Sequence, residues 1–466
     1  MSQHDPNPQR RRVLAGLGAA PLLLTAGAAA VGGATTATAT ATPKTPARTT
    51  LLRNAAVVLT MDPKLGSGEL GALEGADVLL RDGRVEAVGK KLTPPVGARV
   101  VDVTGQIVLP GFVDIHTHLW QSSIRGACAD QDLKGWIFNC ALPAYPKIRP
   151  EDMYRFVRLS TADVLQTGVT TVVDWVHNIS YAATQQYVRA LDDSGVRFVY
   201  AAYQNAKDLD LVRQTKKELI DPLSRATFQV SWGVDNLDRY VALARELKVM
   251  LNVHVLEARY QRAEDPIGKL RAAGAFDSGL LMNHAVHLSD AEIALTAQHD
   301  VRIAHCPLSN MRLASGIARL PELRRHGVKI GLGLDGGTND TSDMFNLMRS
   351  AVGLQRARAE TAEVYPKVAD ALRLATMGGA EAIGMADRIG SLTPGKRADV
   401  ITVNPARLNF APRFDWTSQL VFNGQPGNVW HVFVDGQQLK ADGALVGVSP
   451  DRLVSEAELA ARNTHG

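Results

Sequence analysis

Eight short apolar runs alternate with amphipathic stretches between residues 111 and 384, and this alternation predicts an α/β fold. Strands that alternate with helices form a parallel sheet through right-handed crossovers. Eight such units over about 270 residues match the size of a (β/α)8, TIM-like barrel. Further strand-like runs at both ends of the chain predict a small additional β-sandwich domain.

The expected barrel strands are runs of four to eight mainly apolar residues. They are 113–118, 170–175, 197–203, 227–234, 250–256, 279–286, 301–306 and 329–335. Between them, residues 150–166 and 235–247 carry apolar residues at helical spacing, and Ser289 with Glu292 predicts a capping box at a helix start. Active sites of such barrels lie at the carboxyl ends of the strands, so the residues that end these runs are the candidates for chemistry.

The two ends of the chain have the same β-rich character. Strand-like runs occur at 51–60 and 76–90, and again at 399–403 and 429–439. Asp82-Gly83 and Asp435-Gly436 predict tight hairpin turns. We expect the ends to meet, so that residues 50–110 and 385–450 form one composite β-sandwich domain beside a barrel of residues 111–384.

The first 42 residues have the pattern of an export signal and linker that are not part of the fold. Arg10-Arg11-Arg12 precedes an alanine-rich apolar run, and a Thr/Ala-rich tract follows. The arginines resemble a twin-arginine leader, which predicts a periplasmic or secreted protein. An uncleaved membrane anchor is the alternative, although the run is shorter and more glycine-interrupted than the ~20 apolar residues of a spanning helix. No stable membrane span is expected after the leader is removed.

Composition and charge fit a soluble globular enzyme. Of 466 residues, 45% are hydrophobic and 21% are charged. The leader region, residues 1–50, holds five of the 51 Lys and Arg residues and one of the 47 acidic residues. The rest of the chain is formally neutral, so the charge gives no reason to expect a nucleic-acid partner.

Three cysteines, Cys128, Cys140 and Cys306, exclude a fully paired disulfide framework within one chain. A single Cys128–Cys140 pair stays open for an exported protein. Cys306 ends an apolar run and is expected to be a buried apolar residue.

His116 and His118 end the first expected barrel strand. Residues i and i+2 of a strand point to the same face, so the pair can bind one metal ion. His254 and Asp335 end two further runs. Neutral imidazoles and a carboxylate are ligands for zinc or iron.

Two more residues at strand ends suit proton transfer. Glu257 follows the run that contains His254, and His284 ends the next run, with His287 as an alternative to it. Asp335 also lies in a literal G-x-G-x-x-G match, Gly331 to Gly336. A dinucleotide site is disfavoured there, because the match lies in the last barrel strand and the carboxylate would repel a pyrophosphate.

The segments 109–118, His254 with Glu257, Asn283-His284, 305–310 and 332–336 together resemble the amidohydrolase superfamily, closest to its cytosine-deaminase-like and triazine-hydrolase group. The resemblance covers nearly the whole chain after the leader. It implies one divalent metal ion, zinc or iron, held by His116, His118, His254 and Asp335. Binuclear members bridge two metals with a lysine of the fourth strand, and the run 227–234 has no lysine, which favours one metal. The resemblance also implies a homodimer.

The resemblance predicts a metal-dependent hydrolase of carbon–nitrogen bonds other than peptide bonds. The expected reaction is deamination of an aminated nitrogen heterocycle such as a purine, pyrimidine, pterin or triazine. Glu257, His284 and Asp335 are the expected catalytic residues. The alternative on the same scaffold is displacement of chloride or an alkylamine, or hydrolysis of a cyclic amide. A non-catalytic binding protein would be expected to lack some of these ligands, and all are present.

Several polar and aromatic residues near the ends of the expected strands are candidates for holding a flat heterocycle. Ordinary loop packing is the alternative for each. The candidates are Trp120, Gln121, Trp175, Tyr203 and Asn310, and His177 shares their position.

Overall fold

The structure is a computed structural model that describes residues 49–232, 236–336 and 341–465. The described residues lie in one compact unit that spans residues 46–466. The expected export signal, residues 1–42, lies outside the described residues. Within those described ranges, no helix is long and apolar enough to cross a membrane.

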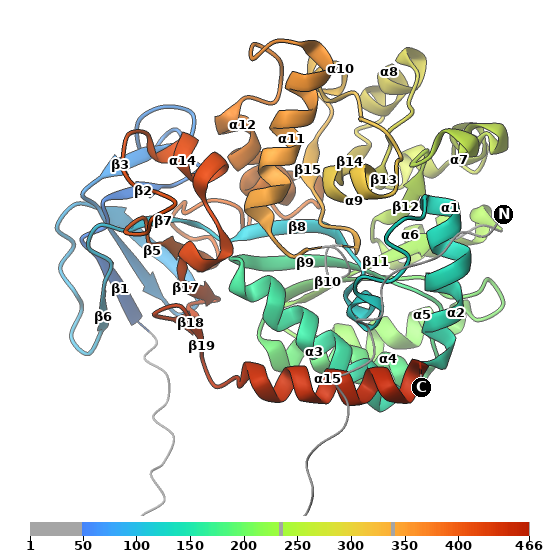
Figure 1. The fold of residues 1–466 in the computed structure, drawn as a ribbon, viewed down its shortest axis with the longest axis horizontal. Coiled ribbons are helices and arrows are strands. Elements are labelled where there is room, and N and C mark those ends of the chain that lie inside the picture. Colours follow the sequence, from blue (N-terminus) through green and yellow to red (C-terminus); the bar gives the residue numbers. More distant parts are fainter. Residues whose placement is uncertain (1–48, 233–235, 337–340, 466) are drawn as a thin grey trace, which may run out of the picture. The chain divides into compact units, whose positions relative to one another are not determined.

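Eight parallel strands, hydrogen-bonded in chain order, form the central sheet (Figure 1). They are β8 (Phe112–Thr117), β9 (Val169–Val176), β10 (Arg197–Ala202), β11 (Ala226–Trp232), β12 (Leu251–Val255), β13 (Leu280–His284), β14 (Arg302–His305) and β15 (Ile330–Leu332). A parallel bridge between Thr117 and Asp335 joins the last strand region to the first. The predicted barrel is confirmed, and each predicted run overlaps one of these strands.

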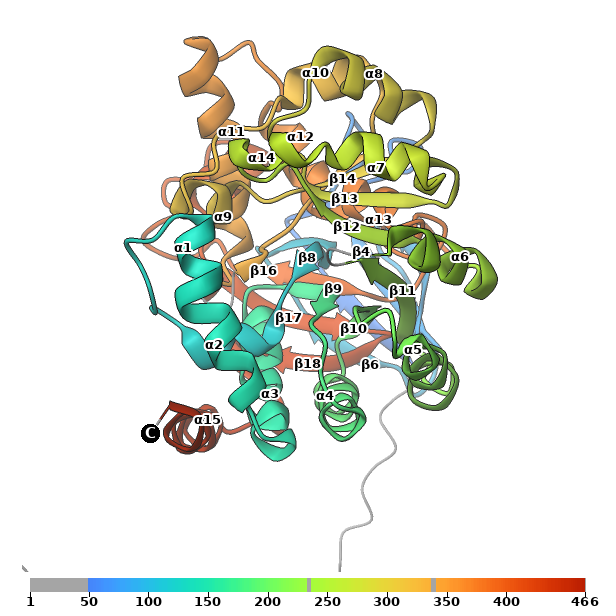
Figure 2. The same cartoon turned by 90° about the vertical axis from the view of Figure 1, so that its right-hand side faces the viewer.

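Helices surround the barrel strands (Figure 2). They are α3 (Pro150–Gln166), α4 (Tyr181–Ser194), α5 (Leu209–Thr215), α6 (Leu237–Leu247), α7 (Pro266–Ala272), α8 (Asp290–Gln298), α10 (Leu320–Arg325), α11 (Met344–Ala359), α12 (Val368–Arg373) and α13 (Gly379–Ala382). Helix α3 has its predicted bounds, begins with Pro150, and buries Met153, Phe156 and Val157 at helical spacing. The predicted capping box of α8 is confirmed, since Ser289 and Glu292 each accept a hydrogen bond from the other's backbone N–H.

The connection from β8 to α3 is built mostly of short helical pieces. It contains a 3₁₀ helix Leu119–Ile124, α1 (Leu133–Trp136), a π-helix Ile137–Ala141, α2 (Leu142–Ala144) and a second 3₁₀ helix Tyr145–Lys147. The structure pairs Cys128 with Cys140 in a disulfide across this connection. The pairing that the sequence left open is therefore formed, and Cys306 is free and buried as expected.

The two ends of the chain meet in two further sheets. One has the order β5-β4-β1-β6 and the other β19-β18-β17-β16-β7-β2-β3. Their strands are β1 (Thr49–Arg53), β2 (Val57–Leu59), β3 (Ala72–Glu74), β4 (Asp77–Arg81), β5 (Arg84–Gly89), β6 (Arg99–Asp102), β7 (Ile107–Pro110), β16 (Val400–Val403), β17 (Val429–Val434), β18 (Gln437–Ala441) and β19 (Ala444–Leu445). Antiparallel pairing of β7 with β16 confirms that N- and C-terminal segments build one β region.

The two sheets share an apolar core, to which Leu52, Val78, Val108, Val400 and Phe433 contribute. The predicted turns are present as well. Both residues of Asp82-Gly83 and of Asp435-Gly436 have positive φ, as a tight hairpin turn of this class requires.

Three further helices complete the described fold. They are α9 (Pro307–Arg312), α14 (Trp416–Asn423) and α15 (Pro450–His465). Helix α15 lies along α3 (Figure 1), where Asn463 Nδ2 donates to both carboxylate oxygens of Asp152 at 3.3 Å. Helix α15 begins where the predicted β-sandwich segment 385–450 ends, and no helix was predicted there.

Candidate metal centre and active site

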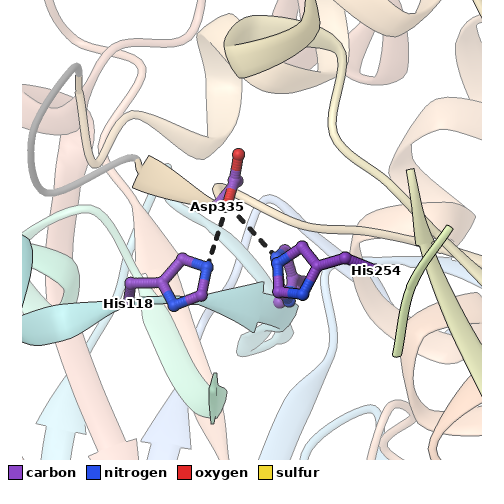
Figure 3. Close-up of side chains that lie close together, drawn as sticks. His118, His254 and Asp335 are labelled. Carbon is purple, nitrogen blue, oxygen red and sulfur yellow. Dashed lines mark ion pairs between the residues drawn. The ribbon is translucent and has the colours of Figure 1, made fainter. Parts of the chain in front are cut away.

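Three histidines and one aspartate converge at the carboxyl ends of three barrel strands. His116 and His118 come from the end of β8, His254 from β12 and Asp335 from the segment after β15. One ligand atom from each of the four lies within 4.8 Å of those of the others. Figure 3 shows the rings of His118 and His254 converging on the carboxylate of Asp335. The structure thus brings together all four residues expected to bind the metal.

His116 shows why this cluster fits a cation. Its side chain is fully buried, and neither ring nitrogen has a hydrogen-bond partner among the described residues. Its Nε2 lies 3.2 Å from Asp335 Oδ1, but without hydrogen-bond geometry. An unpartnered buried polar group is costly, and a metal ion satisfies it. Burial also lowers the pKa of His116, which favours the neutral imidazole that metals bind.

His118 is oriented by a backbone carbonyl. Its Nδ1–H donates to the carbonyl oxygen of Trp175 at 2.7 Å. Nε2 then faces Asp335 Oδ1 at 3.3 Å with its lone pair. A ligand histidine whose other ring nitrogen donates to a carbonyl is typical of metal sites.

Asp335 is fixed where the barrel closes. Its backbone N–H donates to the carbonyl of His116 at 2.6 Å, and its carbonyl accepts from the backbone of His118 and the hydroxyl of Thr117. Asp335 has a φ of 56°, in the left-handed region that only a surrounding structure can hold in place. The same bonds that close the barrel therefore aim this carboxylate.

Gly333 permits the close approach of β15 to β8. A Cβ at this position would lie 2.8 Å from the Cβ of His116 and 3.0 Å from Cys306 Sγ. Asp114 then joins the strands, since its Oδ1 accepts from the backbone N–H groups of Leu334 at 3.0 Å and His116 at 3.2 Å. Gly333 is one of the glycines of the G-x-G-x-x-G match, and its lack of a side chain allows the close packing beside the proposed metal ligands.

Glu257 lies beside this cluster and is 4% exposed. Its Oε2 is 3.5 Å from Nε2 of His284. Burial, and then the nearby charge of Asp335, raise the pKa of Glu257 well above its ordinary value. This shift favours the protonated form of Glu257, which can donate its proton.

Asp335 has the opposite tendency. Burial opposes its ionisation, but the neighbouring imidazole rings, first that of His284 and then those of His116 and His118, outweigh burial and hold its pKa well below the ordinary value. Two neighbouring carboxyl groups with pKa values pushed apart suit one acid and one base.

His284 completes the set. Asn310 Nδ2 donates to its Nδ1 at 3.1 Å, which leaves the proton on Nε2. That nitrogen lies 3.5 Å from Glu257 and 3.9 Å from Asp335 Oδ2. His287, the alternative, instead bonds through Nε2 to the carbonyl of Ser315 at 2.7 Å. The geometry therefore places His284, not His287, in the site.

A cavity of about 170 Å³ opens beside the cluster. Gln121 and Trp175 line it, as do His118, His254, Glu257 and Asp335. Three candidate pocket residues lie elsewhere. Trp120 lies behind His177, Tyr203 stacks on Trp175 with ring centroids 5.5 Å apart, and Asn310 contacts His284.

Much of the cavity wall comes from the β8–α3 connection, which the sequence analysis did not assign to the site. Its lining residues are Leu133, Trp136, Ile137, Ala141, Leu142 and Tyr145. Gln261, Ser309, Arg312 and Leu313 add further lining. The residues from Leu133 to Tyr145 lie far along the chain from the end of β8, so the rule that located the other site residues gave no signal for them.

The family model of amidohydrolases matches residues 107–439. The chain belongs to the amidohydrolase family. It is 30% identical to a 5-methylthioadenosine/S-adenosylhomocysteine deaminase of Syntrophomonas wolfei over 86% of this chain and 97% of that protein. It is 29% identical to a 5'-deoxyadenosine deaminase of Methanothermobacter thermautotrophicus, over 85% of this chain and 97% of that protein. This amidohydrolase is therefore an enzyme that hydrolyses carbon–nitrogen bonds.

Solved structures show the same fold. An adenosine deaminase from Xanthomonas campestris with bound zinc has a TM-score of 0.79 and 27% identity, with 89% of this chain and 98% of that chain covered. An atrazine chlorohydrolase from Arthrobacter aurescens TC1, complexed with zinc and atraton, has a TM-score of 0.80 and 22% identity, with 88% and 100% covered. Both of these solved structures contain zinc, and this chain has a cluster of residues that fits a metal ion.

Proposed function

We propose that this amidohydrolase removes an amino group from a nitrogen heterocycle by hydrolysis and releases ammonia. The observation that carries the proposal is the contact between two groups of residues. The four-residue ligand cluster and a second cluster of Glu257, His284 and Asp335 have Asp335 in common. His118, His254, Glu257 and Asp335 of these clusters line the cavity. Ligands for a metal ion, a proton donor and a proton acceptor thus face one substrate-sized space.

The proposal includes one divalent metal ion, zinc or iron, held by His116, His118, His254 and Asp335. Three imidazoles and a carboxylate suit either ion. Strand β11, the fourth of the barrel, contains no lysine that could bridge a second metal. When bound, such an ion lowers the pKa of a water molecule from 15.7 toward about 7, which supplies a nucleophile at neutral pH.

The chain's own residues move the protons. Asp335 accepts a proton from the attacking water, while Glu257 gives its proton to the ring nitrogen next to the carbon under attack. His284 donates a hydrogen bond from Nε2 to the developing oxyanion. Asp335 then passes its proton to the departing amino group, which leaves as ammonia. The remaining hydroxyl proton returns to Glu257, and the ring carbon keeps the oxygen as a carbonyl.

The substrate that we propose is a flat aminated heterocycle of the purine type. The relatives from Syntrophomonas wolfei and Methanothermobacter thermautotrophicus are named as deaminases of adenosine derivatives. Trp136, Trp175 and Tyr145 line the cavity and offer aromatic surface to such a ring. Their presence supports a planar substrate without fixing its substituents.

Export through the predicted leader, residues 1–42, is part of the proposal. The Cys128–Cys140 disulfide supports it, because structural disulfides persist mainly in oxidising compartments. Fractionation of the native host would find the mature chain outside the cytoplasm. A homodimer, which the family resemblance implies, is checked by light scattering of the purified protein.

Ammonia release tests the proposed reaction. The mature chain, from about residue 43, is loaded with zinc or ferrous iron and offered adenine, adenosine, cytosine, guanine, a pterin and an aminotriazine. We expect ammonia from at least one of them, and its loss after chelation and its return when metal is added back. Firm metal binding with no ammonia from any probe would contradict deamination, and assays for chloride, alkylamine and ring-opened products would then identify the other reaction.

A further inference from the structure

His177 follows β9 and lines the cavity beside the metal centre. Its ring is enclosed by other rings, with centroid distances of 5.1 Å to His118, 4.9 Å to Trp175, 5.2 Å to Trp120 and 5.6 Å to Tyr145. These contacts fix the orientation of the imidazole. The sequence placed His177 near the pocket but gave it no role.

Trp120 determines which nitrogen of His177 carries the proton. The indole Nε1–H of Trp120 donates to His177 Nδ1 at 3.0 Å. An indole nitrogen can only donate a hydrogen bond, so Nδ1 must accept with its lone pair. The proton of the ring is therefore on Nε2.

Trp120 is itself held firmly. It is 1% exposed, and its backbone N–H donates to the hydroxyl of Tyr187 at 3.2 Å. Trp120 does not line the cavity. It therefore orients His177 from behind, as a positioning residue.

The Nε2–H of His177 is an unused donor. Among the described residues, no acceptor bonds to this nitrogen, although Nδ1 has its partner. A histidine with only a packing role would have a hydrogen-bond partner for each ring nitrogen, or would bury that nitrogen away from the cavity. Because His177 is partly exposed and lines the cavity, the donor is available to a molecule bound there.

His177 and Glu257 contact different histidines of the site. His177 packs on His118, whereas Glu257 lies against His284. The ring centroids of His118 and His284 are each 5.4 Å from that of His254. A heterocycle in the cavity can therefore meet Glu257 at one nitrogen and His177 at a second atom.

We propose that His177 determines substrate specificity by donating a hydrogen bond from Nε2 to a second acceptor of the heterocycle, either an unprotonated ring nitrogen or an exocyclic oxo oxygen. This inference rests on the proposed deaminase function and narrows its substrate class. Rings that present a C–H or N–H at that edge bind less well, because a C–H leaves the Nε2–H of His177 without an acceptor and an N–H places a second donor against it.

Matched substrates test the role of His177. The probes are adenosine and adenine with their 7-deaza and 3-deaza analogues, in which one ring nitrogen becomes a C–H. We expect wild-type kcat/KM to fall for one analogue by on the order of 10²-fold or more. In His177→Phe, which keeps a ring but has no donor, the ratio of kcat/KM for the parent compound to kcat/KM for that analogue should fall toward one. The metal content should stay unchanged. His177→Gln, which keeps a donor, should restore part of the discrimination.

His326→Phe is the matched control, because His326 is exposed on the loop after α10. This variant should leave every parent-to-analogue ratio of kcat/KM at its wild-type value. An equal loss for all probes in His177→Phe, with the wild-type ratio preserved, would overturn the inference. If no probe releases ammonia, the proposed function fails separately, and the same ratios are then taken from equilibrium dissociation constants measured by tryptophan fluorescence.

The tautomer can be measured without any substrate. Long-range ¹H–¹⁵N NMR spectra of the metal-loaded protein, labelled at histidine and assigned with His177→Phe, distinguish a protonated from an unprotonated ring nitrogen. We expect the His177 proton on Nε2, and loss of that preference in Trp120→Phe. A His177 proton on Nδ1 in the wild-type protein would overturn the inference, whatever the enzyme proves to deaminate.

Discussion

At the residue scale, the metal centre depends on backbone geometry as much as on its ligands. Leu256, His284 and Asp335 all have positive φ, although none is glycine. Such conformations cost about 1–3 kcal/mol each and persist only where the surroundings enforce them. Leu256 precedes Glu257, and His284 and Asp335 are themselves residues that we assign to proton transfer. Interactions elsewhere in the fold must therefore offset the backbone strain at this site.

Gly333 gives a prediction at this scale. Gly333→Ala should destabilise the protein by about 1–3 kcal/mol, because the new Cβ would press on the strand that carries His116. Zinc affinity should fall with it, since His116 is displaced. Urea unfolding and metal titration measure both effects.

Gly353→Ala is the control for this change. Gly353 lies in α11, and an added Cβ would meet nothing within 4 Å. This variant should gain about 0.5–1 kcal/mol, since glycine is unfavourable within a helix. Equal stability of the two variants would mean that the close approach of β15 to β8 is not required.

At the element scale, one buried arginine joins the barrel to the β region. Arg197 begins β10 and is fully buried. Its Nε and Nη2 bind the carboxylate of Asp399 at 2.7 and 3.0 Å, and Nη2 also binds Asp435. Asp399 precedes β16 and Asp435 follows β17, so the cluster links a barrel strand to the strands of the C-terminal segment.

Arg197→Met should therefore destabilise the fold by about 3–5 kcal/mol, because it leaves the buried carboxylate of Asp399 without its cation and leaves Asp435 with Arg397 alone, at 3.4 Å. The control is Arg189→Met, whose partner Asp193 lies 3.6 Å away at the surface. That change should alter the free energy of unfolding by less than about 1 kcal/mol. Thermal unfolding followed by circular dichroism separates the two cases, and a similar small effect for both would refute a joining role for Arg197.

The disulfide in the β8–α3 connection gives the second prediction at the element scale. The Cys128–Cys140 disulfide encloses Leu133, Trp136 and Ile137, which line the cavity. Cys128→Ser/Cys140→Ser should lower stability by about 2–4 kcal/mol. It should also raise KM more than it lowers kcat, because a wall of the pocket loses its constraint while the metal ligands stay in place.

Reduction of the wild-type protein with a mild thiol supplies a second measurement of the same effect. It should raise KM as the double variant does, and it should not change the KM of that variant. An unchanged KM in both experiments would show that the disulfide does not shape the pocket.

At the scale of the whole molecule, the sequence predicted most of the architecture and the chemical core of the site. Periodicity located all eight barrel strands, and the rule that barrel sites lie at strand ends selected His116, His254 and Asp335 as metal ligands. The hairpin turns at Asp82 and Asp435 were readable because their local chemistry is specific.

Other features depend on long-range packing that local patterns do not encode. Helix α15 is held by contacts with α3, more than 280 positions earlier in the chain. The cavity wall from α1 to α2 consists of pieces too short for a periodic signal. Trp120 looked like a residue that stacks on substrate, yet the structure places it behind His177, because the 3₁₀ helix after β8 turns it inward.

The metal site also spans the whole barrel. The proposed ligands come from the first and fifth strands and from the segment after the eighth, so a bound ion would link distant parts of the chain. Zinc at 100 times its dissociation constant should stabilise the fold by about 2.7 kcal/mol through mass action. Calorimetry with zinc, with magnesium as a control, and after chelation measures this effect. No shift of the unfolding temperature with zinc would contradict metal binding to the native fold.

The central claim is that Glu257 delivers a proton to the substrate beside a metal held by the histidine cluster. The most direct test compares ammonia release and zinc content of the wild type, Glu257→Gln and Glu264→Gln, in which the exposed Glu264 serves as the matched acid. We predict equal zinc content in all three, wild-type turnover in Glu264→Gln, and a loss of about 10²–10⁴-fold in Glu257→Gln. Near-wild-type ammonia release by zinc-loaded Glu257→Gln would contradict the account.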